Sequence, residues 1–259
     1  MTNRPLILMC CWLVSLWIYH GSGTQAKAEE KEEEWQPDSP TFASSSFVVP
    51  PGRFQVETTA TIGKARGENG LSVTAPNFLL RYGFYRNFEF RVSGPGLIRE
   101  QGETNFGDVD LAIKYHLLDE GKWTPAIGLI PQVTLPTASD NAGSGNVNPR
   151  FFLTFDKDLP QGFGVEWNLG AGYIDNQGSG RFFQVLYAVV LSRDLTKSLS
   201  TYAEVYGVSK VQPGEGGSVA TDFGVQFRLS KNIFIYLGAD FGIVNANEQN
   251  ALTGFAFRL

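Results

Sequence analysis

The sequence predicts an all-β protein, a transmembrane antiparallel up-and-down β-barrel of about twelve strands. First, segments in which apolar and polar residues alternate recur from residue 54 to the last residue, and a period of two is that of a strand with two unlike faces. Second, the connections between these segments alternate between short and long. Third, no stretch after residue 28 has the roughly 18 consecutive apolar residues of a spanning helix.

The first 28 residues are predicted to be a secretory signal peptide. Arg4 supplies the positive n-region, residues 6–19 form the apolar core, and Ala26-Lys27-Ala28 fits a cleavage site flanked by small residues. A membrane anchor is the alternative, but the apolar core is shorter than the roughly 20 residues that a spanning helix needs. Cys10 and Cys11 both lie in this segment. The exported protein is therefore expected to have no disulfide and no cysteine metal site.

Residues 29–50 are predicted to be a flexible tail. They open with the charged run EEKEEE and continue into a stretch rich in proline and serine, a composition with little apolar surface to bury. We expect this acidic and serine-rich tail to be solvated, with ordered structure beginning near Pro51 and the barrel spanning residues 51–259.

The hairpin at residues 107–136 shows the strand pattern most clearly. In its first strand Leu111 and Ile113 share one face, while Asp110 and Lys114 share the other. After the turn DEGK the second strand alternates in the same way. A soluble sandwich would cover the apolar face with a second sheet, whereas a transmembrane barrel exposes it to lipid and turns the polar face towards a lumen. The barrel interpretation accounts for the whole chain.

Twelve segments follow this alternation. In 183–191 both faces carry apolar residues, so the sequence leaves the orientation of that strand open. Pro131 interrupts another segment, and because proline cannot donate a ladder hydrogen bond we expect a bulge or a local irregularity there. The segments are 54–62, 78–84, 88–92, 109–117, 127–135, 151–155, 163–171, 183–191, 201–205, 219–229, 235–241 and 255–259.

The links between the segments differ on the two rims. Those after the even-numbered segments are compact, namely YRN, DEGK, DLPQ, RDLTK and SKN, whereas those after the odd-numbered segments are rich in Gly, Asn and Glu and mostly longer. This arrangement is typical of outer-membrane barrels, with short turns and both termini on the periplasmic side. With spanning strands of about 9–11 residues, twelve strands leave room for these loops, whereas sixteen leave too little and eight leave too much.

The charge balance argues against a nucleic-acid partner. Without Arg4 and Lys27 the 21 basic residues fall to 19, against 26 acidic residues, which gives a net charge of −7. Nucleic-acid-binding proteins instead carry a basic footprint.

Four stretches resemble one known family of outer-membrane barrels. They are SPTFASSSFVVPPGRFQVETTATI (39–62), NFLLRYGFYRNFEFRV (77–92), GDVDLAIKYHLLDEGK (107–122) and the next strand, which ends in LPT (135–137). As a series they are similar to the family labelled for the meta-pathway of phenol degradation, or simply as a transporter. The resemblance covers nearly the whole mature chain and implies a twelve-stranded barrel that takes up small compounds, aromatic ones included. The sequence departs from the family at Pro131 and at Leu259, where such barrels usually end in an aromatic residue.

The polar faces of the predicted strands carry the charged residues that we expect to line the lumen. If YRN is a three-residue turn, Phe84 pairs with Phe88 and Arg81 lies opposite Arg91, so nearby acids are needed to balance two like charges. Glu89 is diagonal to Arg81, and Asp108 and Asp110 lie on the next strand, so these acids are expected near the arginines. We expect a basic patch that faces an acidic one and favours small polar solutes; the alternative is that these groups pair with one another and close the barrel. The expected lumen-facing residues are Glu57, Arg81, Glu89, Arg91, Asp108, Asp110, Lys114, Arg150, Asp156, Glu166, Glu204, Asp222, Arg228 and Asp240.

Two other chemistries are weighed against a channel. An outer-membrane lipase or esterase needs a serine and a base, and His116 is the only histidine of the mature chain, with no serine fixed beside it by the sequence. A calcium site would use Asp140, Asn141 or Glu215, but isolated residues on glycine-rich loops lack the spacing of such a site. No enzyme activity, no cofactor and no metal are therefore expected.

The sequence thus predicts an outer-membrane channel or transporter for small, polar or aromatic solutes. A closed structural or adhesion barrel that works through its long loops is the alternative. The expected partners are outer-membrane lipid, a small-molecule solute and the barrel-assembly machinery. Aromatic residues on the lipid-facing parity, for example Tyr82, Trp123 and Trp167, are available for interfacial girdles.

Overall fold

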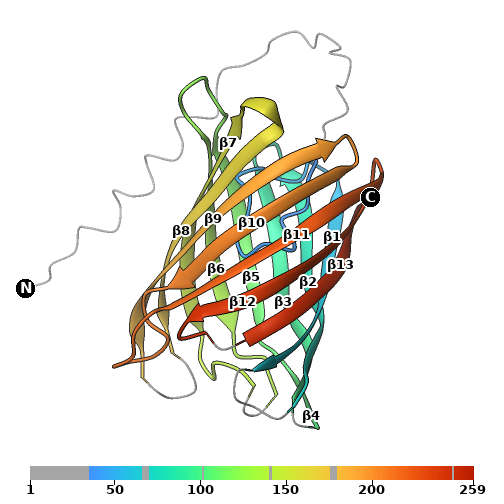
Figure 1. The fold of residues 1–259 in the computed structure, drawn as a ribbon. Coiled ribbons are helices and arrows are strands. Elements are labelled where there is room, and N and C mark those ends of the chain that lie inside the picture. Colours follow the sequence, from blue (N-terminus) through green and yellow to red (C-terminus); the bar gives the residue numbers. More distant parts are fainter. Residues whose placement is uncertain (1–34, 66–69, 101, 140–141, 176–179, 247) are drawn as a thin grey trace, which may run out of the picture. The chain divides into compact units, whose positions relative to one another are not determined.

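The computed structural model describes residues 35–65, 70–100, 102–139, 142–175, 180–246 and 248–259. Within this part of the chain there are thirteen β-strands and one 3-10 helix, Pro160–Gly162 (Figure 1). The strands are β1 (Phe54–Ala65), β2 (Ser72–Tyr85), β3 (Phe88–Glu100), β4 (Glu103–Phe106), β5 (Val109–Leu118), β6 (Ala126–Leu135), β7 (Asn148–Leu159), β8 (Phe163–Ile174), β9 (Phe182–Thr196), β10 (Leu199–Val208), β11 (Ser218–Ser230), β12 (Ile233–Val244) and β13 (Glu248–Arg258).

The sheet closes on itself. Neighbouring strands pair antiparallel around the ring, and β13 pairs with β1. The short strand β4 extends β3 as a hairpin, while β3 itself also pairs with β5. Twelve strands therefore form a closed antiparallel barrel, as the sequence predicts, and closure leaves the barrel wall without an open edge. Among the described residues no helix is both long enough and apolar enough to cross a membrane.

Exposure follows the predicted alternation. On β2 Tyr82 and Phe84 are 43% and 48% exposed on the outside of the barrel. Arg81, which directly precedes Tyr82 and points to the opposite face, is 2% exposed. On β1 Gln55 and Glu57 are fully buried on the inside. Because successive side chains of a strand point to opposite faces, the barrel has an apolar exterior and a polar interior.

The orientation of β9 is now defined. Phe183 and Val189 are exposed on the outer surface, whereas Gln184, Leu186 and Val190 are buried on the inner one. Apolar side chains of this strand therefore point into the lumen, and Ala43 packs against two of them, Ala188 and Val190.

The predicted register of β2 and β3 is correct at its centre and wrong at its turn. Arg81 pairs with Arg91, as expected. The turn, however, contains two residues rather than three, since Tyr85 and not Phe84 pairs with Phe88, and a register shift between Gly83 and Tyr85 absorbs the difference.

Part of one predicted long loop is regular structure. The stretch GPGLIREQGETNF (94–106) is one of the long links predicted after the odd-numbered segments, but its first half continues β3 and its second half forms β4. Leu97 pairs with Phe106 and Glu100 with Glu103. The hairpin thus extends beyond the point at which β3 leaves β5, after the pair Ser93 and Asp110.

Pro131 does perturb one side of its strand. The ladder between β6 and β7 is continuous, and Pro131 itself pairs with Phe151. On the other side the β5–β6 ladder has no partner for Ile130 or Pro131 among the described residues, although the register is the same before and after this gap. The predicted irregularity is therefore a local interruption towards β5 and not a bulge.

Residues 36–50, called the inner segment below, differ from the predicted solvated tail. Six of their backbone amides donate hydrogen bonds to inward-facing side chains of β1, β3, β7, β8 and β10. Only a segment inside the ring can reach five strands spread around it, and Figure 1 shows this segment, in blue, within the barrel. Ordered structure thus begins before Pro51, while the predicted signal peptide and residues 29–34 lie outside the described residues.

Candidate functional site: the lumen and its inner segment

The inner segment is held by its backbone. Its amides have no ladder partner, so buried N–H groups must find other acceptors. Glu204 accepts from the amides of Phe42 and Ala43 at 2.7 and 2.8 Å. The remaining acceptors are Glu57 for Ser39, Asn168 for Ser44, Asp156 for Ser46 and Glu89 for Val49, at 2.5 to 2.7 Å. Most of these bonds are charge-assisted, which makes them shorter and stronger than bonds between neutral groups.

Asp38 attaches the inner segment to three cations. Its carboxylate lies 3.1 Å from Nη1 of Arg81, 2.6 Å from Nη1 of Arg91 and 2.7 Å from Nζ of Lys114. All four side chains are buried, and Asp38 is 5% exposed. Burial alone would raise the pKa of Asp38, but the charges of Arg81, Lys114 and Arg91 hold it well below its usual range.

Two wall carboxylates complete this arrangement. Glu89 accepts from Nε of Arg81 at 2.7 Å and from Nη1 of Arg91 at 3.1 Å, and Glu57 accepts from Nη1 of Arg81 at 3.0 Å. The three cations Arg81, Arg91 and Lys114 and the three anions Asp38, Glu57 and Glu89 form what we call the charge cluster. It carries no net charge, as a buried ionic group requires.

The charge cluster corrects one part of the sequence prediction. Glu89 does balance Arg81 and Arg91, as its diagonal position implied. Asp108 and Asp110, also expected near these arginines, instead lie at the end of the barrel that carries the long loops. The missing counter-ion comes from Asp38, in the stretch predicted to be a tail.

The opposite side of the lumen is acidic. Cross-strand pairing places Asp156 beside Glu166, and Glu204 beside Asp222, which in turn pairs with Asp240. These five residues, called the acidic wall, lie on β7, β8 and β10–β12, across the ring from the cations on β2, β3 and β5. Like charges in register destabilise a sheet, and the amides that the inner segment directs at Asp156 and Glu204 supply compensating donors.

An apolar contact covers the inward side chains of β9. Ala43 of the inner segment packs in a buried cluster with Ala188, Val190 and Tyr202. Beside it, the ring of Phe42 stacks on Tyr206 with 4.9 Å between centroids. The inward apolar residues of β9 are therefore the docking surface for the inner segment.

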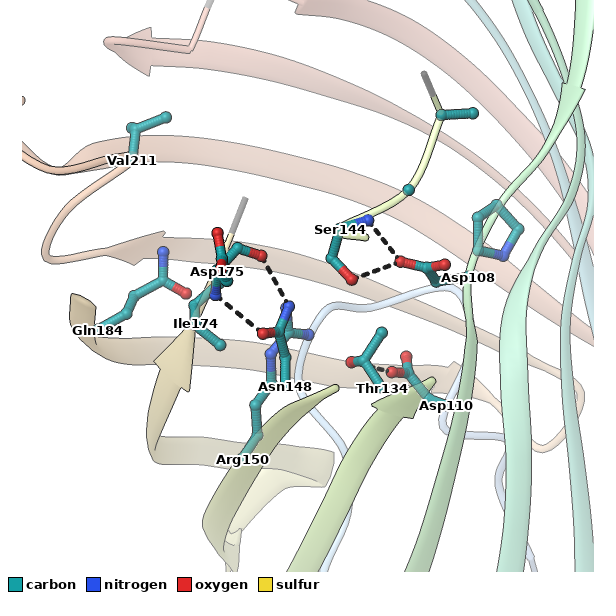
Figure 2. A pocket seen from close by; sticks show the side chains of 13 residues that line it. Asp108, Asp110, Thr134, Ser144, Asn148, Arg150, Ile174, Asp175, Gln184 and Val211 are labelled. Carbon is teal, nitrogen blue, oxygen red and sulfur yellow. Dashed lines mark hydrogen bonds between the residues drawn. The ribbon is translucent and has the colours of Figure 1, made fainter. Parts of the chain in front are cut away.

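A cavity of about 380 Å³ lies at the long-loop end of the lumen (Figure 2). Asp108 lies on one side of the cavity and accepts hydrogen bonds from the amides of Thr137, Ala138 and Ser144 and from the Ser144 hydroxyl at 2.6 to 3.0 Å. Burial would raise the pKa of Asp108, but these hydrogen bonds hold it below its ordinary value. Other lining residues are Asp110, Thr134, Asn148, Arg150, Asp175 and Gln184.

Two residues weighed from the sequence lie outside the charge cluster, the acidic wall and the cavity: Arg228, expected to line the lumen, and His116, considered and set aside as a catalytic base. Arg228 is near the short-turn rim, where its guanidinium lies 5.8 Å from the centre of the Phe234 ring. His116 contacts the carbonyl oxygen of Ser46 at 3.0 Å and the carboxylate of Asp119 at 2.8 Å, and its ring stacks on Phe47. No serine hydroxyl contacts His116 in the described part of the chain, so the pair that a serine hydrolase requires is not assembled there.

No group of three or more His, Cys, Asp or Glu residues suited to a metal ion occurs in the described ranges. Glu215, one of the residues weighed for calcium, accepts from Nε2 of Gln212 at 2.7 Å. Asp140 and Asn141 lie outside the described residues.

Residues 37–259 match the model of a protein family described as "Putative MetA-pathway of phenol degradation". The match begins within the inner segment, so this segment belongs to the matched region. No curated protein matches the chain.

Solved structures with a similar fold include the COG4313 outer membrane channel from Pseudomonas putida F1, with a TM-score of 0.61 and 11% identity over 83% of this chain and 98% of that chain. The NanC porin has a TM-score of 0.56 and 11% identity over 78% and 100% of the two chains. The KdgM porin has a TM-score of 0.53 and 10% identity over 78% and 98%. At such identities the likeness concerns the fold.

Proposed function

Since this chain belongs to the family described as "Putative MetA-pathway of phenol degradation", we propose that it is an outer-membrane channel for small solutes whose lumen is held closed by the inner segment. The observation that carries the proposal is a barrel with an apolar exterior around a charged interior, in which a chain segment without strand structure occupies the lumen. An apolar exterior of this kind suits lipid, and a polar interior suits water and solutes.

In this proposal a solute enters from the long-loop end. The loop-end cavity has the size of a small-molecule site and combines acids, amides and one arginine. Passage to the other rim requires the inner segment to move, because its residues cover side chains such as Glu57, Lys114 and Thr154, which have no exposed surface. The family's description supports small aromatic compounds as solutes, and the lining supports polar groups on them.

A closed structural or adhesion barrel is the second candidate. It is favoured by the same occupation of the lumen, since the charge cluster is balanced and the apolar side chains of β9 are covered. The two candidates differ in whether the inner segment ever leaves its place.

Planar-bilayer recording separates them. We expect brief and rare openings for the wild-type protein and sustained current for a variant that lacks residues 36–46, with heat-modifiable migration as the proof that the variant has folded. The Arg81→Ala/Arg91→Ala variant should also conduct, because it loses two anchors of Asp38. Absence of current from all three folded proteins would leave the closed barrel as the function.

A further inference from the structure

The charge cluster contains a binding site for a carboxylate, and the chain fills this site itself. Arg81, Arg91 and Lys114 come from three neighbouring strands, β2, β3 and β5, and their nitrogens converge on the two oxygens of Asp38 at 2.6 to 3.1 Å. Guanidinium groups are well suited to carboxylate geometry, and ionised partners give the strongest hydrogen bonds.

The balance of charges in the cluster defines the charge of the ligand that the site can bind. Glu57 and Glu89 belong to the barrel wall and balance two of the three cations. If Asp38 leaves with the inner segment, one positive charge of the triad is no longer balanced by an acid of the barrel wall beside it. The vacated site therefore calls for one negative charge.

We infer that the triad of Arg81, Arg91 and Lys114 is a binding site for the carboxylate of a small monoanionic solute, and that Asp38 occupies this site as an internal stand-in while the channel is closed. The inference deepens the proposed function, since it names the solute class and the contact that a solute replaces. A solute carboxylate and Asp38 compete for the same three cations, so binding of one favours departure of the other.

The competition is biased towards Asp38. Asp38 is tethered to the barrel, so its effective concentration at the triad is high, on the order of millimolar or more for a short flexible connection. The backbone bonds of the inner segment to Glu204, Asn168 and Asp156 add to this bias. A free carboxylate is therefore expected to bind poorly to the wild-type protein and well to a protein in which Asp38 has lost its side chain.

Chemical rescue in detergent solution tests the site. The full chain carrying Asp38→Ala is heated in increasing sodium acetate, and the midpoint of its heat-modifiable migration is compared with that in acetamide and in sodium chloride of equal ionic strength. Acetate should raise the midpoint in a saturable way and recover about half or more of the loss caused by the substitution, because a ligand that binds the folded state stabilises it. Acetamide and chloride should not.

Three further variants sharpen the result. Asp38→Asn removes the same charge while keeping the shape of the side chain, so acetate should raise its midpoint as it does for Asp38→Ala. Asp38→Ala/Lys114→Met removes one charge of each sign, which balances the cluster and should abolish the response to acetate. Asp158→Ala, in an exposed side chain near the short-turn rim, is the matched control and should behave as the wild type does.

A second measurement covers the case in which Asp38→Ala does not fold. Ser46 is fully buried in the inner segment, so a Ser46→Cys variant reports displacement of the segment by its rate of maleimide labelling. Acetate, and not acetamide, should raise that rate in the otherwise native chain.

An equal response to acetate and acetamide, in the midpoint or in the labelling, would overturn the carboxylate site. Neither measurement depends on conductance, so a protein that responds to acetate but passes no current would refute only the channel.

Discussion

Replacing Asp38 by asparagine should release the inner segment while the barrel stays folded. The substitution keeps the shape of the side chain but removes the charge that meets Arg81, Arg91 and Lys114 at 3.1, 2.6 and 2.7 Å. These side chains are at most 8% exposed, so solvent does little to screen the contacts. Loss of one partner of a buried ion pair costs about 3–5 kcal/mol, because the other charge is left uncompensated.

That cost applies to docking of the inner segment. Since about 1.4 kcal/mol corresponds to a factor of ten, the ratio of released to docked segment should rise roughly 150- to 4,000-fold. Labelling of Ser46→Cys measures this ratio when docking is faster than labelling, because the modified fraction then follows the population of the open form. Cys10 and Cys11 lie in the predicted signal peptide, so the introduced thiol is expected to be the only one in the mature protein.

The control is Asp158→Asn in the same Ser46→Cys background, which removes an exposed acid of the same type and should leave the labelling rate unchanged. A rise of less than about threefold for Asp38→Asn, in a protein that keeps heat-modifiable migration, would refute the role of Asp38 as the anchor. It would mean that the amide contacts to the wall hold the segment on their own.

Three further changes follow from the structure. The lowered pKa of Asp38 means that its contribution is complete above the ordinary aspartate value of about 3.9 and is lost as the pH falls towards the lower folded value. The difference in heat midpoint between wild type and Asp38→Asn should therefore be constant from about pH 7 to 5 and shrink below about pH 4, and a difference that does not change with acid would contradict this. Ala43→Trp should overfill the contact with Ala188, Val190 and Tyr202, costing docking about 1–3 kcal/mol and raising Ser46→Cys labelling roughly 5- to 150-fold, whereas unchanged labelling would show that this contact has room. Pro131→Val should restore an N–H towards β5 and raise the free energy of unfolding in denaturant by about 0.5–1.5 kcal/mol, and a decrease would mean that the gap in the ladder has another origin.

Most of the barrel could be predicted because an apolar exterior and a polar lumen impose a period of two on every strand of the ring. The alternation in 109–117 and the position of Arg81 opposite Arg91 are local consequences of that period, and the structure agrees with both. The prediction of a three-residue turn between β2 and β3 was wrong, because the spacing of apolar residues does not reveal a register shift such as that between Gly83 and Tyr85. The β3–β4 hairpin was missed because Gly94, Pro95 and Gly96 resemble the start of a loop, although the chain continues as strand.

The inner segment could not be recognised from its own composition. Its residues 42–46 bind the polar wall mainly through backbone amides, and almost any residue supplies an amide, so the run FASSS carries no specific pattern. Two signals elsewhere in the sequence point to it. Leu186 and Val190 give β9 an apolar inner face that water would not favour, and the first strands place three cations against two acids on one stretch of wall. The apolar inner face and the excess positive charge each require a partner from outside the strands.

The sequence positions of the residues that bind the inner segment determine when this segment can dock during folding. Glu204, which holds Phe42 and Ala43, lies more than 160 residues further along the chain, and Asp156 lies 110 residues beyond Ser46. These carboxylates surround the segment only after most of the ring has formed, so residues 36–50, although they precede every strand of the barrel, are among the last to reach their final position. A ring that has just closed therefore has an unfilled lumen until the inner segment reaches these acceptors.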